Sequence, residues 1–116
     1  MSIIAEQPAH AAAIETILDL AFGVKRTAKT VYRLRVNVPP IAELSFVNAR
    51  ADEVFATIRY WPVSITNGET ALLLGPIAVA RHRHGEGLGA ALIDHSLSRA
   101  ALLGHSAVLL VGDAPY

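Results

Sequence analysis

The sequence contains no cysteine, and this absence excludes several classes of site at once. Disulfide scaffolds, thiolate zinc sites, iron–sulfur clusters and cysteine nucleophiles all need a residue that the chain does not have. An excess of charge is also lacking, because 10 Lys and Arg residues balance 10 Asp and Glu residues. A dedicated nucleic-acid-binding protein usually carries a basic excess, so we expect no nucleic-acid partner.

Long hydrophobic runs are missing as well. The longest, residues 71–80, is broken by Gly75 and Pro76, whereas a membrane-spanning helix needs about 20 apolar residues. The opening residues, MSIIAEQPAH, lack both the basic start and the apolar stretch of a signal peptide. We therefore expect no membrane partner and a cytoplasmic location.

Hydrophobic residues are nevertheless abundant, at 53% of 116 residues. That content is enough to bury a core, and the length suits one domain, since domains cluster at about 100–150 residues. The chain has no internal repeat, linker or low-complexity segment. We expect residues 1–116 to form a single domain.

The pattern of apolar residues and breakers predicts eight elements. In order they are strand 2–6, helix 8–23, helix 27–35, strand 44–51, strand 54–65, strand 70–80, helix 87–103 and strand 107–111. Asn67-Gly68 predicts a hairpin turn, and Gly75-Pro76 predicts a bulge within its strand. We also expect a bulge or frayed edge at Pro62. The last strand–helix–strand unit implies a parallel pair, so the fold class is α/β or α+β with a mixed sheet.

Both long helices are expected to bury one face. In helix 8–23 the apolar spacing predicts burial of Ile14, Ile17, Leu18 and Ala21. In helix 87–103 the expected buried face is Ala90, Ile93, Leu97, Ala100 and Ala101, and the expected outward residues are Asp94, His95, Ser98 and Arg99. Gly23 and Gly104 stand where glycines commonly end helices.

The densest chemical signal is residues 77–91, IAVARHRHGEGLGAA, where a strand leads through a basic, glycine-rich loop into a helix. The first amides of a helix lack intrahelical partners, and the helix dipole is positive at that end. Gly85, Gly87 and Gly89 would let anionic oxygens approach the backbone closely. Together with the charge of Arg81 and Arg83, these features predict a phosphate-binding site.

Three classes of phosphate-bearing ligand use loops of this kind. A P-loop needs Lys-Ser/Thr after the last glycine, and Ala90-Ala91 stand there instead, which excludes it. Gly85, Gly87 and Ala90 match the GxGxxG/A pattern of a dinucleotide-binding loop, and Asp113 follows at about the spacing of that pattern's acidic residue. However, four residues separate the strand from the glycines, whereas such a loop follows its strand directly. The third ligand is acyl-coenzyme A, bound through its pyrophosphate.

The loop resembles the acyl-CoA signature of GNAT-type N-acetyltransferases, Gln/Arg-x-x-Gly-x-Gly/Ala, at residues 84–89 (HGEGLG). Residues 74–79 resemble the fourth strand of that family, and residues 109–116 resemble its fifth strand and the following loop. The resemblance implies a GNAT-like acyl-CoA N-acyltransferase fold and a transferase that uses acetyl-CoA as co-substrate. The acceptor would be a primary amine of a small molecule or peptide, attacking the thioester directly in a ternary complex.

The resemblance also implies which residues bind the cofactor. Backbone groups of Ile77 and Val79 would pair with the pantetheine arm as if it were an added strand, and the amides of 84–90 would hold the pyrophosphate. The implied set is Ile77, Ala78, Val79, His84, Gly85, Glu86, Gly87, Leu88, Gly89 and Ala90.

Glu53 and Glu69 are candidate proton acceptors, and Tyr32, Arg33 and Arg35 could line an acceptor site, but we assign no catalytic residue. His82 and His84 have a spacing that zinc could use, yet no partners complete a set, so we assign no metal.

Two departures from the family pattern shape the expectations. His84 stands where the signature has Gln or Arg, which predicts a weaker, pH-dependent anion contact. Family members also run longer, adding a tyrosine, a short helix and two strands, so the chain is expected to be C-terminally truncated. The bare edge of the last strand then predicts a homodimer formed through it. The alternatives to an active acetyltransferase are a non-catalytic acyl-CoA-binding remnant and a dinucleotide-binding fragment.

Overall fold

The computed structural model describes residues 2–23, 38–51, 53–64 and 68–110. Its elements, in order, are β1 (Ser2–Ala5), η1 (Pro8–His10), α1 (Ala11–Phe22), η3 (Ala42–Leu44), β2 (Phe46–Arg50), β3 (Glu53–Ser64), β4 (Thr70–Val79), η5 (Arg81–Arg83), α3 (Leu88–Leu102) and β5 (Val108–Leu110). The helix predicted over 27–35 lies outside the described residues. No helix in the described ranges is long and apolar enough to cross a membrane.

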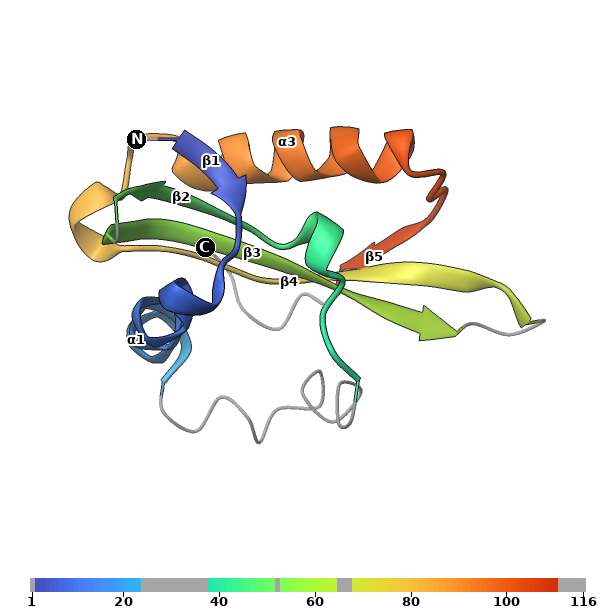
Figure 1. Cartoon of the computed structure of the whole chain (residues 1–116), viewed down its shortest axis with the longest axis horizontal. Helices are drawn as coiled ribbons and strands as arrows, with labels where there is room; N and C mark the ends of the chain where they lie inside the picture. The colour runs from blue at the N-terminus through green and yellow to red at the C-terminus, as the bar shows by residue number, and fades with distance from the viewer. Residues whose placement is uncertain (1, 24–37, 52, 65–67, 111–116) are drawn as a thin grey trace.

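The five strands form one mixed sheet in the order β1-β2-β3-β4-β5. The first four pair antiparallel with their neighbours, and β4 and β5 pair parallel. Helix α3 makes the connection between the two parallel strands, as the sequence predicted. Figure 1 shows α3 covering one face of the sheet and α1 lying against the other.

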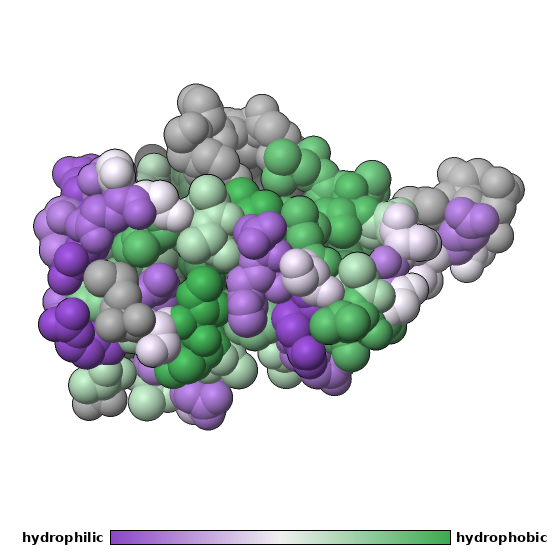
Figure 2. All heavy atoms as spheres, turned by 90° about the horizontal axis from the view of Figure 1, so that it is seen from above, coloured by the Kyte–Doolittle hydropathy of each residue, from purple (hydrophilic) through white to green (hydrophobic). Residues whose placement is uncertain are grey.

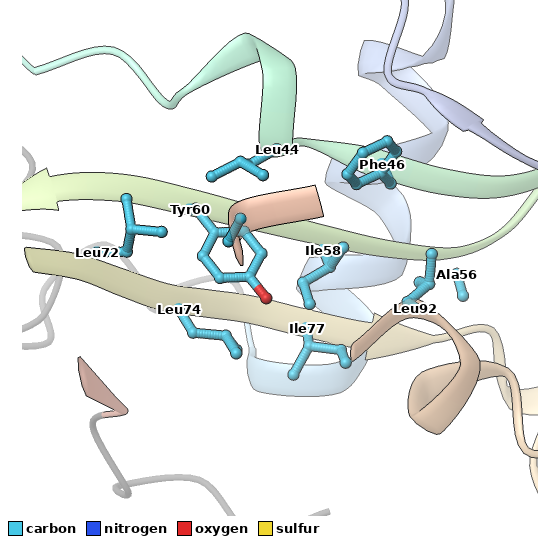
Figure 3. Close-up of a cluster of buried hydrophobic side chains, with 10 residues drawn as sticks. Leu44, Phe46, Ala56, Ile58, Tyr60, Leu72, Leu74, Ile77 and Leu92 are labelled. Carbon is cyan, nitrogen blue, oxygen red and sulfur yellow. The ribbon is translucent and has the colours of Figure 1, made fainter. Parts of the chain in front are cut away.

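Each face of the sheet has its own buried cluster. The cluster under α3 contains Leu44, Phe46, Ala56, Ile58, Tyr60, Leu72, Leu74, Ile77, Leu92 and Ala100 (Figure 3). The cluster under α1 contains Ile14, Ile17, Leu18, Val47, Ala49, Val54 and Ala78. Strand β4 contributes to both clusters, which explains why its sequence is apolar almost throughout.

The buried face of α3 differs from the prediction. Leu92, Ser96 and Ala100 are buried, whereas Ala90, Leu97 and Ala101 are exposed. Ser96 can face the core because its Oγ lies 2.7 Å from the Tyr60 hydroxyl, which gives the buried serine a hydrogen-bond partner. The spacing of apolar residues does not reveal such a polar contact. His95, predicted to point outward, packs edge-to-face on Phe46 at a centroid distance of 4.7 Å.

Three smaller predictions also need correction. Ala21 is exposed, although the apolar spacing of α1 placed it on the buried face. Leu44 is buried within η3 and not within a strand. Pro62 forms no bulge, because it pairs in register with Leu72. The edge position predicted as the alternative is present, since β2 does not reach this part of β3 and no ladder bond is lost there.

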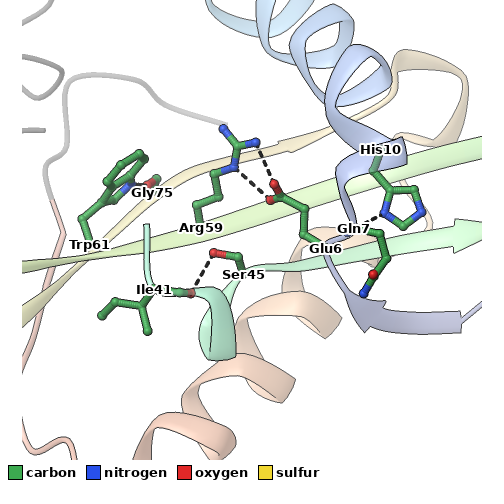
Figure 4. Close-up of polar contacts among 8 residues, drawn as sticks. All are labelled: Glu6, Gln7, His10, Ile41, Ser45, Arg59, Trp61 and Gly75. Atoms are coloured by element: carbon green, nitrogen blue, oxygen red, sulfur yellow. Dashed lines mark hydrogen bonds and ion pairs between the residues drawn. The ribbon is translucent and has the colours of Figure 1, made fainter. Parts of the chain in front are cut away.

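The bulge predicted at Gly75-Pro76 is confirmed. Ile58 pairs with Ile77 but Tyr60 pairs with Leu74, so both residues of the Gly-Pro pair lie opposite Arg59. The Trp61 indole Nε1 donates to the Gly75 carbonyl at 2.5 Å, which satisfies an oxygen that has left the ladder (Figure 4).

Arg59 itself is held by an ion pair at this bulge. Its Nε and Nη2 each donate to one carboxylate oxygen of Glu6 at 2.9 Å, and the two side chains are only 16% and 19% exposed. Such a bidentate, largely buried pair fixes geometry more firmly than an exposed one. It joins the end of β1 to the middle of β3 on the face that carries α1 (Figure 4).

Candidate functional site

Beyond the bulge, one edge of β4 has no strand partner among the described residues. The Ala80 amide donates to the Phe55 carbonyl of β3 at 2.7 Å. Because successive strand residues direct their backbone groups to opposite sides, those of Val79 and Ile77 are directed away from β3. In the described part of the chain β5 pairs only with residues 72–74, so it does not reach them. The edge can therefore accept an extended ligand that carries amide groups.

The glycine loop follows immediately and ends at the start of α3. Gly87 is the N-cap with φ +76°, and no side chain caps the helix. The first amide with a helical acceptor is that of Ala91, which donates to the Gly87 carbonyl at 3.0 Å. The amides of Leu88, Gly89 and Ala90 thus lack intrahelical acceptors, as the first turn of a helix requires.

Two glycines of this loop are needed for its backbone conformation. Gly85 and Gly87 have φ values of +86° and +76°, which L side chains rarely adopt, and no atom beyond the adjacent residues lies within 4 Å of where their Cβ would be. At Gly89 a Cβ would meet Val79 Cγ2 at 3.6 Å and Ile77 Cδ1 at 3.8 Å. The first turn of α3 therefore packs closely on β4, while the loop before it leaves its backbone open.

A cavity of about 1130 Å³ joins these features. Every residue of the predicted cofactor-binding set lines it except Glu86, which is exposed. A second wall comes from α1 and the start of β3, and consists of Ala13, Thr16, Ile17, Leu20, Ala21, Phe22, Glu53 and Val54. Sequence reasoning missed this wall because α1 is distant along the chain; its only signal was the small, apolar composition of the helix.

The basic residues of the loop have partners of their own. Arg81 Nη2 donates to the Leu20 carbonyl at the end of α1, at 3.1 Å. The Arg83 guanidinium lies over the Phe55 ring, 4.5 Å from its centroid, and its Nη1 lies 3.5 Å from Glu86 Oε1. These contacts tie the loop to α1 and β3, so both arginines have a structural role that the sequence did not indicate.

Neither histidine of the loop is without contacts. His82 packs against Phe55 with ring centroids 6.0 Å apart. His84 Nε2 lies 2.9 Å from the Val79 carbonyl oxygen, so the imidazole points back to β4. The anion contact predicted for His84 remains a prediction.

The other candidates divide between the cavity and the rest of the molecule. Glu53 lines the cavity at the start of β3, near the glycine loop. Glu69 is an exposed residue beside the β3–β4 turn and does not line it. Tyr32, Arg33 and Arg35 lie outside the described residues. The structure therefore brings nine of the ten predicted cofactor-binding residues and one candidate proton acceptor, Glu53, to the same cavity.

Solved structures share this fold. A GNAT family acetyltransferase from Brucella melitensis, crystallised in complex with acetyl-CoA, is 29% identical and matches with a TM-score of 0.76 over 99% of this chain and 77% of that one. The GNAT family N-acetyltransferase YhbS from Escherichia coli, in complex with CoA, is 26% identical and matches with a TM-score of 0.77 over 97% of this chain and 62% of that one.

A more distant match agrees in fold. Naa50 from Arabidopsis thaliana, solved with a bisubstrate analogue, is 15% identical and has a TM-score of 0.66 over 94% of this chain and 68% of that one. No family model matches the chain, and no curated protein sequence matches it. The chain has the GNAT acetyltransferase fold, which confirms the resemblance and the mixed α/β class predicted from the glycine loop and its flanking elements.

Proposed function

We propose that this chain binds acetyl-CoA along the free edge of β4 and transfers its acetyl group to a primary amine of a small molecule or peptide. The observation that carries the proposal is the continuity of the site. One cavity contains the edge of β4 at Ile77 and Val79, which has no strand partner among the described residues, and the uncapped amides at the start of α3. Acetyl-CoA has an amide-bearing arm followed by a pyrophosphate, in the same order.

The residues present fit this ligand. A pyrophosphate would be held by amides within residues 84–90, where Gly85 and Gly87 leave the backbone open. Backbone groups of Ile77 and Val79 would pair with the arm by strand addition. Bound acetyl-CoA supplies an activated thioester, and the protein contributes its orientation toward the amine. The acetyltransferases from B. melitensis and E. coli, crystallised with acetyl-CoA and CoA, support this choice.

The dinucleotide alternative fits less well. Dinucleotide-binding loops follow a strand directly and open a parallel sheet. Here η5 separates β4 from the glycines, and β4 has an antiparallel neighbour in β3. We expect CoA to displace a fluorescent CoA analogue, and NAD to compete at least about tenfold more weakly, a difference of about 1.4 kcal/mol in binding free energy. Equal competition would favour the dinucleotide alternative.

Catalysis is tested by the release of free thiol from acetyl-CoA in the presence of a panel of amines. The panel should include polyamines, amino acids, aminoglycosides and a peptide with a free N-terminus. Thiol release that depends on one amine class, with a matching acetylated product by mass spectrometry, supports the proposed transfer. Tight CoA binding without release for any amine would favour a non-catalytic acyl-CoA-binding protein instead.

We further infer that two copies associate through β5. All three of its residues are exposed, with Leu110 at 64%, and Leu102 at the end of α3 is 76% exposed. In the described part of the chain, β5 pairs with β4 alone, so its other edge can add a strand from a second copy. Figure 2 shows hydrophobic residues at the surface on the side of the molecule that carries α3.

Light scattering across a concentration series tests this association. Leu110→Lys should shift the chain toward monomer, because a charge on β5 opposes edge pairing. Ile4→Lys is the matched control, since Ile4 is 41% exposed on β1 at the opposite edge of the sheet. A wild-type chain that stays monomeric at high concentration contradicts the inference.

A further inference from the structure

One side chain connects the two halves of the candidate site. His84, the first residue of the glycine signature, directs Nε2 to the carbonyl oxygen of Val79, five residues earlier, at 2.9 Å. Val79 belongs to the free edge of β4, and His84 immediately precedes the amides that lead into α3. The contact thus spans the junction between the proposed binding sites for the arm and for the pyrophosphate.

The chemistry of this contact defines the state of the ring. A carbonyl oxygen can only accept a hydrogen bond, so His84 Nε2 must carry the proton. In the neutral ring Nδ1 is then left with a lone pair, which makes it an acceptor and a poor neighbour for phosphate oxygens. A direct phosphate contact through Nε2 would require the bond to Val79 to break.

Backbone bonds close the same segment. The Arg83 amide donates to the Ala80 carbonyl at 2.9 Å, and the His84 amide donates to the Arg81 carbonyl at 3.2 Å. These bonds shape η5 internally, but neither joins it to the edge of β4. In the described part of the chain, the imidazole supplies the hydrogen bond that returns from the loop to Val79.

We propose that His84 is a positioning residue, which fastens the glycine loop to the end of β4 and so aims the loop amides at the pyrophosphate. The proposal rests on the proposed function, since it concerns how that site binds CoA. The side chain acts as a donor to Val79 and not as the anion ligand expected from its place in the signature. A carbonyl oxygen has two lone pairs, so Val79 can also accept an amide of the arm while the imidazole stays in place.

The test compares two replacements of the same residue. His84→Gln keeps an N–H donor three bonds from Cβ, whereas His84→Leu keeps the bulk without a donor. The matched control is His82→Leu, which alters the other loop histidine that packs on Phe55. Affinities are measured for CoA and for ADP, which has a diphosphate but no pantetheine arm.

We expect His84→Leu to lower the affinities for CoA and for ADP alike, by about 5- to 20-fold, because one hydrogen bond that orders the loop is lost. His84→Gln should restore both affinities to within about threefold of the wild type, and His82→Leu should leave them within the same range. Thermal unfolding of each variant establishes that it folds. Unchanged or tighter CoA binding by His84→Leu overturns the proposal, as does His84→Gln binding as weakly as His84→Leu.

A measurement without ligand separates this proposal from the proposed function. Nitrogen-15 NMR of the imidazole should find the Nε2-protonated form at neutral pH, and amide exchange in residues 80–87 should be faster in His84→Leu than in His84→Gln. A ring protonated on Nδ1 alone, or equal exchange in both variants, overturns the positioning role. If the wild type does not bind CoA, the proposed function is contradicted. The imidazole NMR and the amide exchange then still test whether His84 positions the loop.

Discussion

The two halves of β4 differ in what they pair with. Residues 72–74 pair with β3 on one side and with β5 on the other, whereas β3 is the one strand that pairs with residues 77–79 in the described part of the chain. Gly75-Pro76 divides them, opposite Arg59. The first half lies between two strands, and the second half lines the cavity. A two-residue interruption thus separates a part of β4 that is internal to the sheet from the part at which we propose that the ligand binds.

The largest effect should come from the loop that continues the second half. Gly87→Val places a β-branched residue at φ +76°, which is strained, and puts methyl groups into the open space over the loop. We expect CoA affinity to fall by at least about 100-fold, because an anion could no longer approach the amides. Isothermal titration calorimetry measures the change.

The control for Gly87→Val is Gly68→Val, which introduces the same backbone strain away from the glycine loop. Gly68 lies before β4 at φ +77°, also with no atom within 4 Å of where its Cβ would be. Gly68→Val should lower the free energy of unfolding by a similar amount, of order 1–2 kcal/mol, and leave CoA affinity unchanged. Equal loss of affinity in both variants would mean that strain, and not the site, determines binding.

The next effect concerns the residue opposite the bulge. Arg59→Ala leaves the Glu6 carboxylate largely buried without its partner, so we expect a loss of about 2–4 kcal/mol of stability. The double variant with Glu6→Ala should recover part of that loss, because no unpaired charge remains. Urea unfolding of the four proteins gives the coupling free energy, and a value near zero contradicts the importance of the pair.

A smaller effect on stability is expected from the buried hydroxyl of Tyr60, which lies in the cluster under α3. Tyr60→Phe removes the hydroxyl that lies 2.7 Å from Ser96 Oγ, while Ser96 keeps its bond to the Leu92 carbonyl at 2.7 Å. We expect a loss of about 1 kcal/mol in the free energy of unfolding with no change in CoA affinity. Weakened CoA binding by this variant would show that the two halves of β4 are not independent.

The smallest effect is a pH dependence from the same residue. Burial raises the pKa of the Tyr60 hydroxyl above its ordinary value of 10.0, and the hydrogen bond with Ser96 opposes this in part. The stability linked to this raised pKa is present below pH 10 and is lost as the pH rises further, when the unfolded tyrosine ionises more readily. The stability difference between wild type and Tyr60→Phe should therefore shrink as the pH rises above 10. A difference that grows over this range contradicts the assignment.

Local signals in the sequence predicted the second half of β4 well. The strand, the Gly75-Pro76 bulge, the glycine loop and the start of α3 depend on backbone conformation, which glycine and proline control over a few residues. The parallel pairing of β5 followed from the strand–helix–strand order. These features were sufficient to predict the fold, and they led to the cofactor-binding residues that we propose.

Contacts between distant segments could not be predicted in the same way. The apolar pattern of α3 did not reveal that Ser96 would be buried, because its partner Tyr60 is 36 residues away. For the same reason the wall provided by α1 and the contact of Arg81 with Leu20 were missed. The periodicity of apolar residues indicates which face of an element is buried. It does not indicate which polar groups from distant segments form hydrogen bonds with each other.

Hydrogen exchange of the backbone amides, with CoA and with ADP, tests the central claim most directly. The account predicts that both ligands protect amides within residues 84–90, that CoA alone also protects Ile77 and Val79, and that residues 72–74 are unaffected by either ligand. CoA binding that leaves residues 77–79 and 84–90 unprotected would contradict the account.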